Sequence, residues 1–302
     1  MNLLPAIAVP ETIHGNVDIR SWRTCINRHS QLKRDSSRTL LGRSLRLTGR
    51  LCLIFFVIFL LPVGCKVASH YADDNRARSW SQLRHDSSQQ APDPFDFEGA
   101  VIQVYSARAA RWRGAFGVHS WIAVKPSDAT HYTRLEVMGY ALRWSGSTVR
   151  VRSGRPDGYW YGSRPWLLRE IRGGKQVDEL IERLIAAAQN YPYDDQYNVW
   201  PGPNSNTFIA WLAREVPELR LELPATAIGK DYLPHGALAM QSPSGTGMQV
   251  SLRGMLGVMI APEEGIEFNI LGLTAGIDLY PPALKLPGIG RVGFSDYKKS
   301  TL

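Results

Sequence analysis

Residues 51–65 of the 302-residue chain read LCLIFFVIFLLPVGC and carry no charge. The sixteen residue steps from Arg50 to Lys66 span roughly 24 Å as a helix, close to the roughly 30 Å of a bilayer core, and both cations can reach toward water. Because a run this apolar must be shielded from water, it predicts a membrane segment at 46–67. The centre of a secretory signal has a similar length, so retention and removal are both open.

Charge asymmetry across this run predicts its orientation. The nearest arginines before it are Arg38, Arg43, Arg46 and Arg50, whereas Asp73 and Asp74 follow it. The positive-inside rule then places the N-terminus in the cytoplasm and the rest of the chain on the other side. Residues 61–65 also resemble a bacterial lipobox ending at Cys65, although an ordinary apolar cysteine explains that residue as well.

The net charge of +8 does not indicate a nucleic-acid-binding domain. Residues 1–50 hold nine Lys/Arg against three Asp/Glu, which leaves only +2 for the other 252 residues. All three cysteines, Cys25, Cys52 and Cys65, precede residue 66, so the rest of the chain has no thiol for a disulfide, a zinc site or a nucleophile. No histidine pair has metal-ligand spacing, and we expect no metal and no cofactor.

Composition and periodicity divide the chain into five parts. They are a basic arm at 1–45, the membrane segment at 46–67, a polar tether at 68–96, an α+β core at 97–225 and a β-rich extension at 226–302. The core has β-rich runs at 100–105, within 116–125 and within 132–144, followed by an amphipathic helix at 176–190. We expect an antiparallel sheet with packed helices.

The extension consists of short apolar runs separated by glycine. Runs at 248–252, 255–260, 266–271 and 275–280 predict antiparallel strands. The low charge of these runs has two explanations. The apolar side chains pack inside the protein in the ordinary way, or they form a surface that rests on a lipid bilayer.

Residues 202–208, GPNSNTF, break the chain and then open an apolar, helix-spaced run. The first N–H groups of a helix lack intrahelical partners, and the helix dipole favours negative charge there. Ser205 is therefore either a helix cap or a nucleophile.

The segments FGVHSWIAV at 116–124 and NSNTFI at 204–209 resemble the two hallmark segments of circularly permuted papain-like proteins. That class includes lecithin:retinol acyltransferase and permuted relatives of NlpC-type peptidases. The resemblance implies a permuted papain-like core in which Ser205 holds the position of the nucleophilic cysteine, His119 that of the base and Phe208 that of an anchoring aromatic. A hydroxyl needs a better-aligned base than a thiol, so a non-catalytic protein is the alternative.

The next predicted strand offers two candidates to orient the base, Glu136 and His131. They have opposite strand parity, so only one can share the site of His119, and we favour Glu136. Asn204 and Asn206 would help to position an oxyanion at the helix start. Each assignment has a plain alternative: His119 as a hydrogen-bonded core residue and Glu136 as a surface ion pair.

A second resemblance covers most of the chain after residue 97. The strings YPYDDQYNVWPGPNSNTFIAWLAREVPEL, TAIGKDYLP and PPALKLPGIGRVG are similar to a bacterial membrane-associated family, domain of unknown function 3750. This resemblance implies an envelope protein, here a single-pass protein of the bacterial inner membrane with its domain in the periplasm.

Aromatic residues gather before the Ser205 helix, among them Trp121, Trp160 and Trp200. They would suit a substrate groove, although core aromatics would give the same pattern. We expect either a serine-dependent hydrolase or acyltransferase acting on an amide or ester, or a non-catalytic envelope module that binds a lipid, glycan or peptide. A purely structural partner-binding domain is a third reading.

Overall fold

A computed structural model describes residues 43–72, 83–294 and 298–301, which fall into two units divided between residues 54 and 55. Within the described residues, one helix, Arg43–Ala72, is long and apolar enough to cross a membrane. It contains the π-helical stretch η1 (Phe56–Leu60) and α2 (Leu61–Ala72), and it includes the predicted segment 46–67. Most of the predicted arm and residues 73–82 of the predicted tether lie outside the described residues.

The first sheet of the second unit contains the predicted core strands. Its order is β13 (Lys298–Thr301), β5 (Trp166–Gly173), β1 (Ala100–Arg108), β2 (Val118–Lys125), β3 (Thr133–Val137) and β4 (Val149–Ser153). All neighbours are antiparallel except β13 and β5. The fold is therefore α+β, as the sequence predicts.

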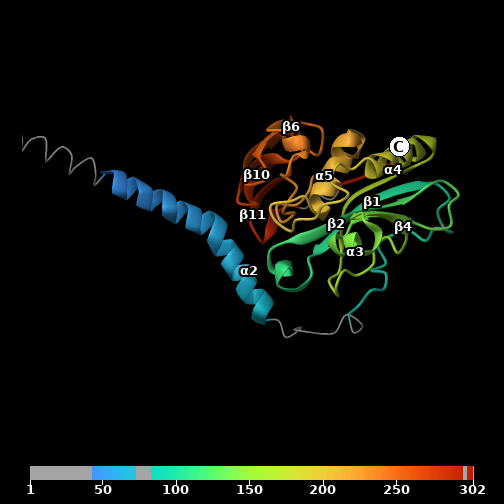
Figure 1. Ribbon diagram of the computed structural model, residues 1–302, viewed down its shortest axis with the longest axis horizontal. Helices are drawn as coiled ribbons and strands as arrows, with labels where there is room; N and C mark the ends of the chain where they lie inside the picture. The colour runs from blue at the N-terminus through green and yellow to red at the C-terminus, as the bar shows by residue number, and fades with distance from the viewer. Residues whose placement is uncertain (1–42, 73–82, 295–297, 302) are drawn as a thin grey trace, which may run out of the picture. The chain divides into compact units, whose positions relative to one another are not determined.

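Two helices cover one face of this sheet (Figure 1). The helix α4 (Lys175–Gln189) matches the amphipathic pattern predicted at 176–190, and α5 (Ser205–Glu215) begins at the predicted break. Phe208, Ile209 and Leu212 of α5 pack with Val118 and Ile122 of β2 in one buried cluster. Burial of these apolar side chains fixes α5 against β2.

A smaller apolar cluster lies on the opposite face of the first sheet. It contains Val101, Tyr105, Ala107, Trp121, Ala123 and Tyr132. Residues 83–91 approach this side, because the buried carboxylate of Asp157 accepts hydrogen bonds from Ser87, Ser88 and the backbone of Gln90. The described end of the predicted tether thus makes specific contacts with the domain.

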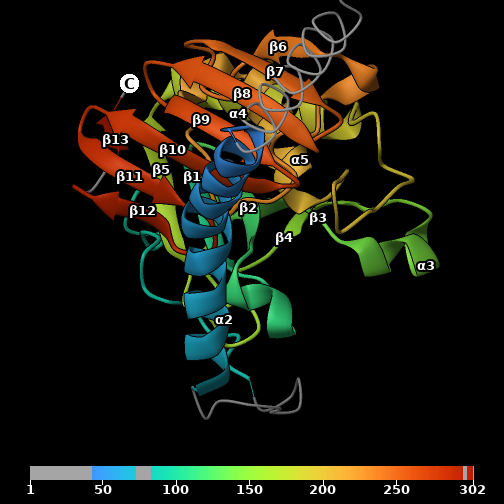
Figure 2. The same ribbon diagram turned by 90° about the vertical axis from the view of Figure 1, so that its left-hand side faces the viewer.

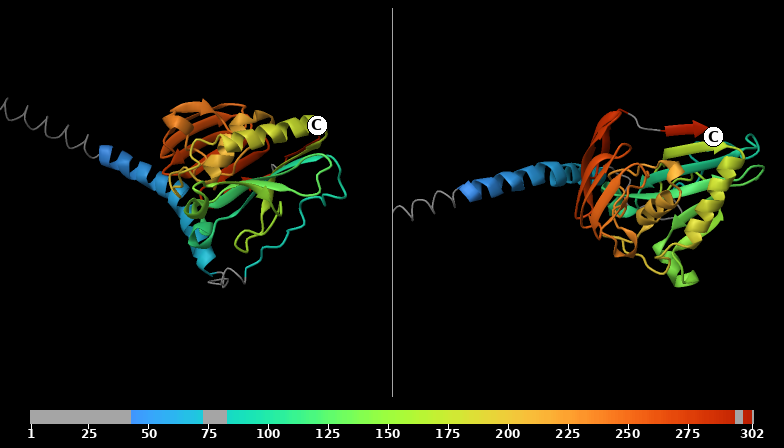
Figure 3. Two further views of the ribbon diagram at one scale, coloured as in Figure 1. Left: turned by 45° about the vertical axis from the view of Figure 1, so that its right-hand side comes forward. Right: turned by 90° about the horizontal axis from the view of Figure 1, so that it is seen from above.

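The second sheet is a seven-stranded antiparallel meander, seen in Figures 2 and 3 beside α5. Its strands are β6 (Ala239–Gln241), β7 (Met248–Leu252), β8 (Leu256–Ala261), β9 (Gly265–Ile270), β10 (Leu273–Leu279), β11 (Pro282–Leu286) and β12 (Gly290–Gly293). The four strands predicted from 248 to 280 are found as β7 to β10, each to within two residues.

Short helical turns connect these elements. They are η3 (Arg111–Ala115), η4 (Gly139–Ala141), α3 (Leu142–Ser145), η5 (Pro217–Leu219) and η6 (Pro234–Gly236).

Candidate functional site

His119 and Glu136 lie together on the face of the first sheet opposite α5. His119 is the second residue of β2, and Glu136 stands on the neighbouring strand β3. The Nε2 atom of His119 is 3.8 Å from Oε2 of Glu136, and both side chains are buried. The other candidate, His131, is exposed and precedes β3. The structure therefore places Glu136, and not His131, beside His119.

Arginines surround the carboxylate of Glu136. Arg134 donates a hydrogen bond of 2.6 Å to Oε2, and Arg152 lies 3.9 Å from Oε1. Burial alone would raise the pKa of Glu136, but His119 and Arg134 outweigh it and hold that pKa at about 2. Burial lowers the pKa of His119 despite the nearby carboxylate, so the imidazole is neutral at pH 7.

Aromatic rings enclose His119 on this face. Its imidazole stacks on Trp160, with ring centroids 3.9 Å apart and an interplanar angle of 12°, and it also lies beside Trp121. The indole N–H of Trp121 donates to Pro156 O, and the guanidinium of Arg134 lies over the Trp121 ring. The Nε2 atom of His119 has no hydrogen-bond partner in the described part of the chain.

The cap of α5 is Asn204, which corrects the expectation that Ser205 could cap the helix. The side chain of Asn204 accepts hydrogen bonds from the backbone N–H groups of Asn206 and Thr207, while the Thr207 hydroxyl accepts from the backbone N–H of Asn204. This reciprocal arrangement is a capping box. It also occupies the backbone N–H of Asn206, at the helix start where Asn204 and Asn206 are expected to position an oxyanion.

The loop at 226–229 binds the polar side chains at the start of α5. The carbonyl of Ile228 accepts from Asn204 and Asn206, and the carbonyl of Gly229 accepts from Thr207. Asn206 also donates to Val118 O, directly before His119. Gly229 has φ +100°, and a Cβ there would lie 2.3 Å from the side chain of Asn204. Only glycine fits this close approach without strain.

Ser205 is buried, and its hydroxyl makes no hydrogen bond within the described residues, unlike the three polar side chains around it. No hydrogen bond joins it to His119, whose Nε2 is unpartnered. The helix α5 packs on the β2 face that carries Val118 and Ile122, whereas His119 projects from the other face toward Trp121 and Trp160. The catalytic roles of Ser205, His119 and Glu136 therefore stay predictions.

A cleft of about 230 Å³ opens beside Glu136. Arginines and aromatic rings line it, and the charged and aromatic members are His85, Arg134, Glu136, Tyr140, Arg152, Arg155, Tyr159, Trp160 and Tyr161. Trp160 separates His119 from the cleft by stacking on its ring. The cleft thus presents cations and flat aromatic surface, with His119 beneath its wall.

The three tryptophans predicted as groove walls have different environments. Trp160 lines the cleft, whereas Trp121 has no exposed surface. Trp200 is half exposed and its indole N–H donates to Leu271 O in the turn between β9 and β10. Sequence reasoning missed Arg134 and Arg152 as site residues. Their alternation with Glu136 on two neighbouring strands could have placed them on its face.

A larger cavity of about 410 Å³ contains none of the predicted site residues. Three of its arginines already have partners in the second sheet or its turns: Arg108 donates to Gly288 O, Arg220 pairs with Glu263, and Arg291 pairs with Asp278. We therefore place the site at the smaller cleft. The described residues hold no group of three or more His, Cys, Asp or Glu that could bind a metal.

Comparison with known proteins identifies one family. Residues 99–232 match the model of a family described as "Protein of unknown function (DUF3750)". This match supports the family membership that the sequence strings imply. It spans all the residues of the His119–Glu136 pair, the cleft aromatics and the start of α5. Searches of curated proteins and of solved structures found no significant match.

Proposed function

We propose that this chain is a membrane-anchored binding protein whose arginine-aromatic cleft takes an anionic glycan. The observation that carries the proposal is the lining of the cleft, where three arginines and a single carboxylate lie beside Tyr159, Trp160 and Tyr161. Sugar rings pack on flat aromatic surfaces, and guanidinium groups pair with carboxylates.

The charges of the cleft favour an acidic ligand. Arg134 is already paired with Glu136 at 2.6 Å. Arg152 is half exposed and lies 3.9 Å from the same carboxylate, and the side chain of Arg155 makes a long hydrogen bond of 3.4 Å to His85 O. Since these two guanidinium groups are weakly engaged, a ligand carboxylate can bind them at a small cost in existing contacts.

A pair of disaccharides tests this proposal. N-acetylglucosaminyl-N-acetylmuramic acid carries a carboxylate, whereas N,N′-diacetylchitobiose has similar rings and none. Isothermal titration of the full chain should show binding of the first and weaker or absent binding of the second. The double variant Arg152→Gln, Arg155→Gln should bind the acidic disaccharide about tenfold or more weakly than the natural chain. Arg143 is an exposed arginine on α3, and Arg143→Gln should leave the affinity unchanged. Equal affinity for both sugars, or no binding, would contradict the proposal.

Serine-dependent hydrolysis or acyl transfer is the second candidate, on a permuted papain-like core. It is favoured by Nε2 of His119, which is buried without a hydrogen-bond partner in the described residues, by Glu136 beside that imidazole, and by the buried Ser205 at the start of α5. A fluorophosphonate probe that labels the natural chain but not Ser205→Ala would support this function over simple binding.

The membrane anchor belongs to the same proposal. The helix Arg43–Ala72 supports a single span, and the arginines before its uncharged run at 51–65 support an N-terminus in the cytoplasm. The cleft would then face the periplasm of a bacterium.

A further inference from the structure

The second sheet has an apolar outer face. The outward positions of β7 to β11 hold only apolar residues, in register across the sheet: Val250 stands opposite Val258, which stands opposite Phe268, and Ile277 stands opposite Leu284. Among these five residues, exposure ranges from 37% for Val258 to 56% for Val250. Because monomeric proteins rarely expose so continuous an apolar surface, this face is expected to contact something apolar.

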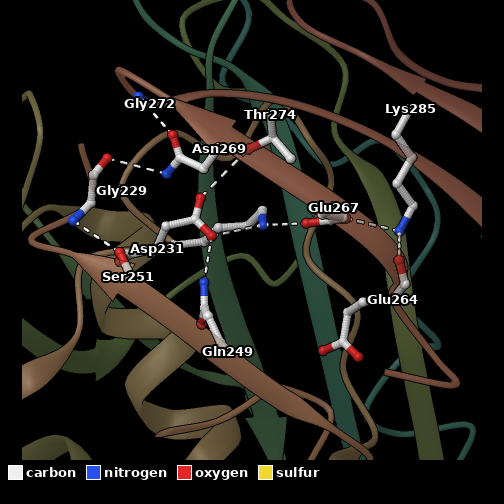
Figure 4. A network of polar contacts seen from close by, with 12 residues as sticks. Gly229, Asp231, Gln249, Ser251, Glu264, Glu267, Asn269, Gly272, Thr274 and Lys285 are labelled. Atoms are coloured by element: carbon white, nitrogen blue, oxygen red, sulfur yellow. Dashed lines mark hydrogen bonds and ion pairs between the residues drawn. The ribbon is translucent and has the colours of Figure 1, made fainter. Parts of the chain in front are cut away.

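The inner face of the same sheet is polar and buried (Figure 4). Glu267 pairs with Lys230 at 2.5 Å and with Lys285 at 2.9 Å, while Asp231 accepts a hydrogen bond from Gln249. An ordinary antiparallel sheet buries its apolar face and exposes its polar one. Here the alternation is reversed on β7, β9, β10 and β11, whereas β8 is apolar on both faces. The apolar outer face is therefore a consistent feature of all five strands.

The part of the candidate membrane helix from Phe55 on belongs to the same compact unit as this sheet and meets it. Its stretch η1 contacts β10, and Phe59 of η1 is buried. Val63 of α2 lies beside Gly288, in the turn between β11 and β12. The neighbouring helix residues Phe56 and Leu60 are exposed and apolar. The apolar surface of the helix is therefore continuous with that of the sheet.

From these contacts we infer that the outer face of the second sheet docks on the lipid bilayer that the helix enters. Uncharged side chains of β7 to β11 would insert among the acyl chains near the membrane surface, as apolar side chains of membrane-surface proteins do. The polar inner face would remain attached to α5 and the core. The domain would then be held at a fixed orientation to the membrane, and not on a free tether. This contact is independent of the glycan cleft.

A lipid-quenching experiment on the full chain tests the inference. With Cys25, Cys52 and Cys65 replaced by serine, a single cysteine is introduced by Val258→Cys on the outer face or by Glu179→Cys on the exposed side of α4. Each is labelled with the environment-sensitive dye NBD. The protein is reconstituted at one copy per nanodisc of phosphatidylethanolamine and phosphatidylglycerol, with or without doxyl groups on the acyl chains.

The dye at 258 should emit at shorter wavelength and be quenched by doxyl lipids at least twice as strongly as the dye at 179. Adding Phe268→Asp, which puts a charge opposite Val258, should reduce that quenching while circular dichroism stays unchanged. Equal quenching at the two positions, with equal access to aqueous iodide, would overturn the inference. Energy transfer between two labelled copies in larger vesicles, without doxyl quenching, would overturn it too, because a second copy would then cover the face.

Discussion

The Nε2 atom of His119 lies 3.8 Å from Oε2 of Glu136, too far for a hydrogen bond, although both side chains are buried on one sheet face. Glu136 pairs instead with Arg134, and burial keeps the imidazole neutral at pH 7. The pair thus contains a carboxylate whose negative charge is already balanced by Arg134 and a base that is covered by Trp160. This relationship determines how the site should respond to pH and to mutation.

The first prediction concerns the titration of His119. Its folded pKa lies below the ordinary 6.5, so the unfolded chain binds the proton more readily. The stability of the folded chain should therefore fall as pH decreases below about 6.5. Denaturant unfolding measures the free energy of unfolding at pH 7 and at pH 5. Between these two pH values, that free energy should fall less for His119→Gln than for the natural chain. His131→Gln, at an exposed histidine, should behave like the natural chain.

Removal of the Glu136 charge should destabilise the domain. Glu136→Gln leaves Arg134 without its partner in a mostly buried position, at a cost of about 3 kcal/mol in the free energy of unfolding. Because the folded pKa of Glu136 is about 2, this stabilisation is present above pH 4.5 and is lost as pH falls toward 2. Glu179→Gln on α4 is the control. An unchanged unfolding free energy for Glu136→Gln would show that Arg134 finds another partner.

Local patterns predicted much of the first sheet and its site. The apolar periodicity of α4 and the alternation on β2 and β3 are short-range signals, and they placed Glu136 on the face of His119. They do not reveal which face of β2 receives α5, because Val118, His119 and Trp121 are all buried and both faces pack. Asn204 and Ser205 are both good caps by residue type, and only the position of the 226–229 loop selects Asn204.

The close approach of Gly229 to Asn204 yields a paired stability test. Gly229→Ala would place a methyl group against the cap side chain at a positive φ, whereas Gly146→Ala, also at positive φ, has open space around it. Gly146→Ala should lower the free energy of unfolding by about 1 kcal/mol, from backbone strain alone. Gly229→Ala should lower it by clearly more, about 2 to 4 kcal/mol. Thermal unfolding monitored by circular dichroism measures both. Equal costs would mean that the cap of α5 can shift without penalty.

The second sheet shows where sequence reasoning reaches its limit. Its strands follow from apolar runs and glycine breaks, but alternation alone does not say which set of residues faces inward. The usual expectation is that apolar residues are buried. Here Glu267 and Lys285 are buried because they find each other and Lys230 across three segments distant in sequence. Such pairing is a tertiary property that no local window contains.

The arginines before the span predict the topology of the whole chain. A fusion after residue 96 to alkaline phosphatase, which folds actively only outside the cytoplasm, should be active. The same fusion to a reporter that is active only in the cytoplasm should be silent. The reverse pair of results would place the domain in the cytoplasm and remove a periplasmic glycan as its ligand.

The last prediction separates a binding protein from an enzyme at Ser205. Since Asn204 is the cap, Ser205→Ala should leave the melting temperature nearly unchanged, whereas Asn204→Ala should cost about 1 to 2 kcal/mol. In a chain whose natural cysteines are serine, the thiol of Ser205→Cys should react with iodoacetamide at pH 7 no faster than free cysteine, because no hydrogen bond from Ser205 reaches His119. A thiol that reacts at least tenfold faster would show that the helix start and His119 activate this position. The hydrolase or acyltransferase would then replace the binding protein as the better account of the site.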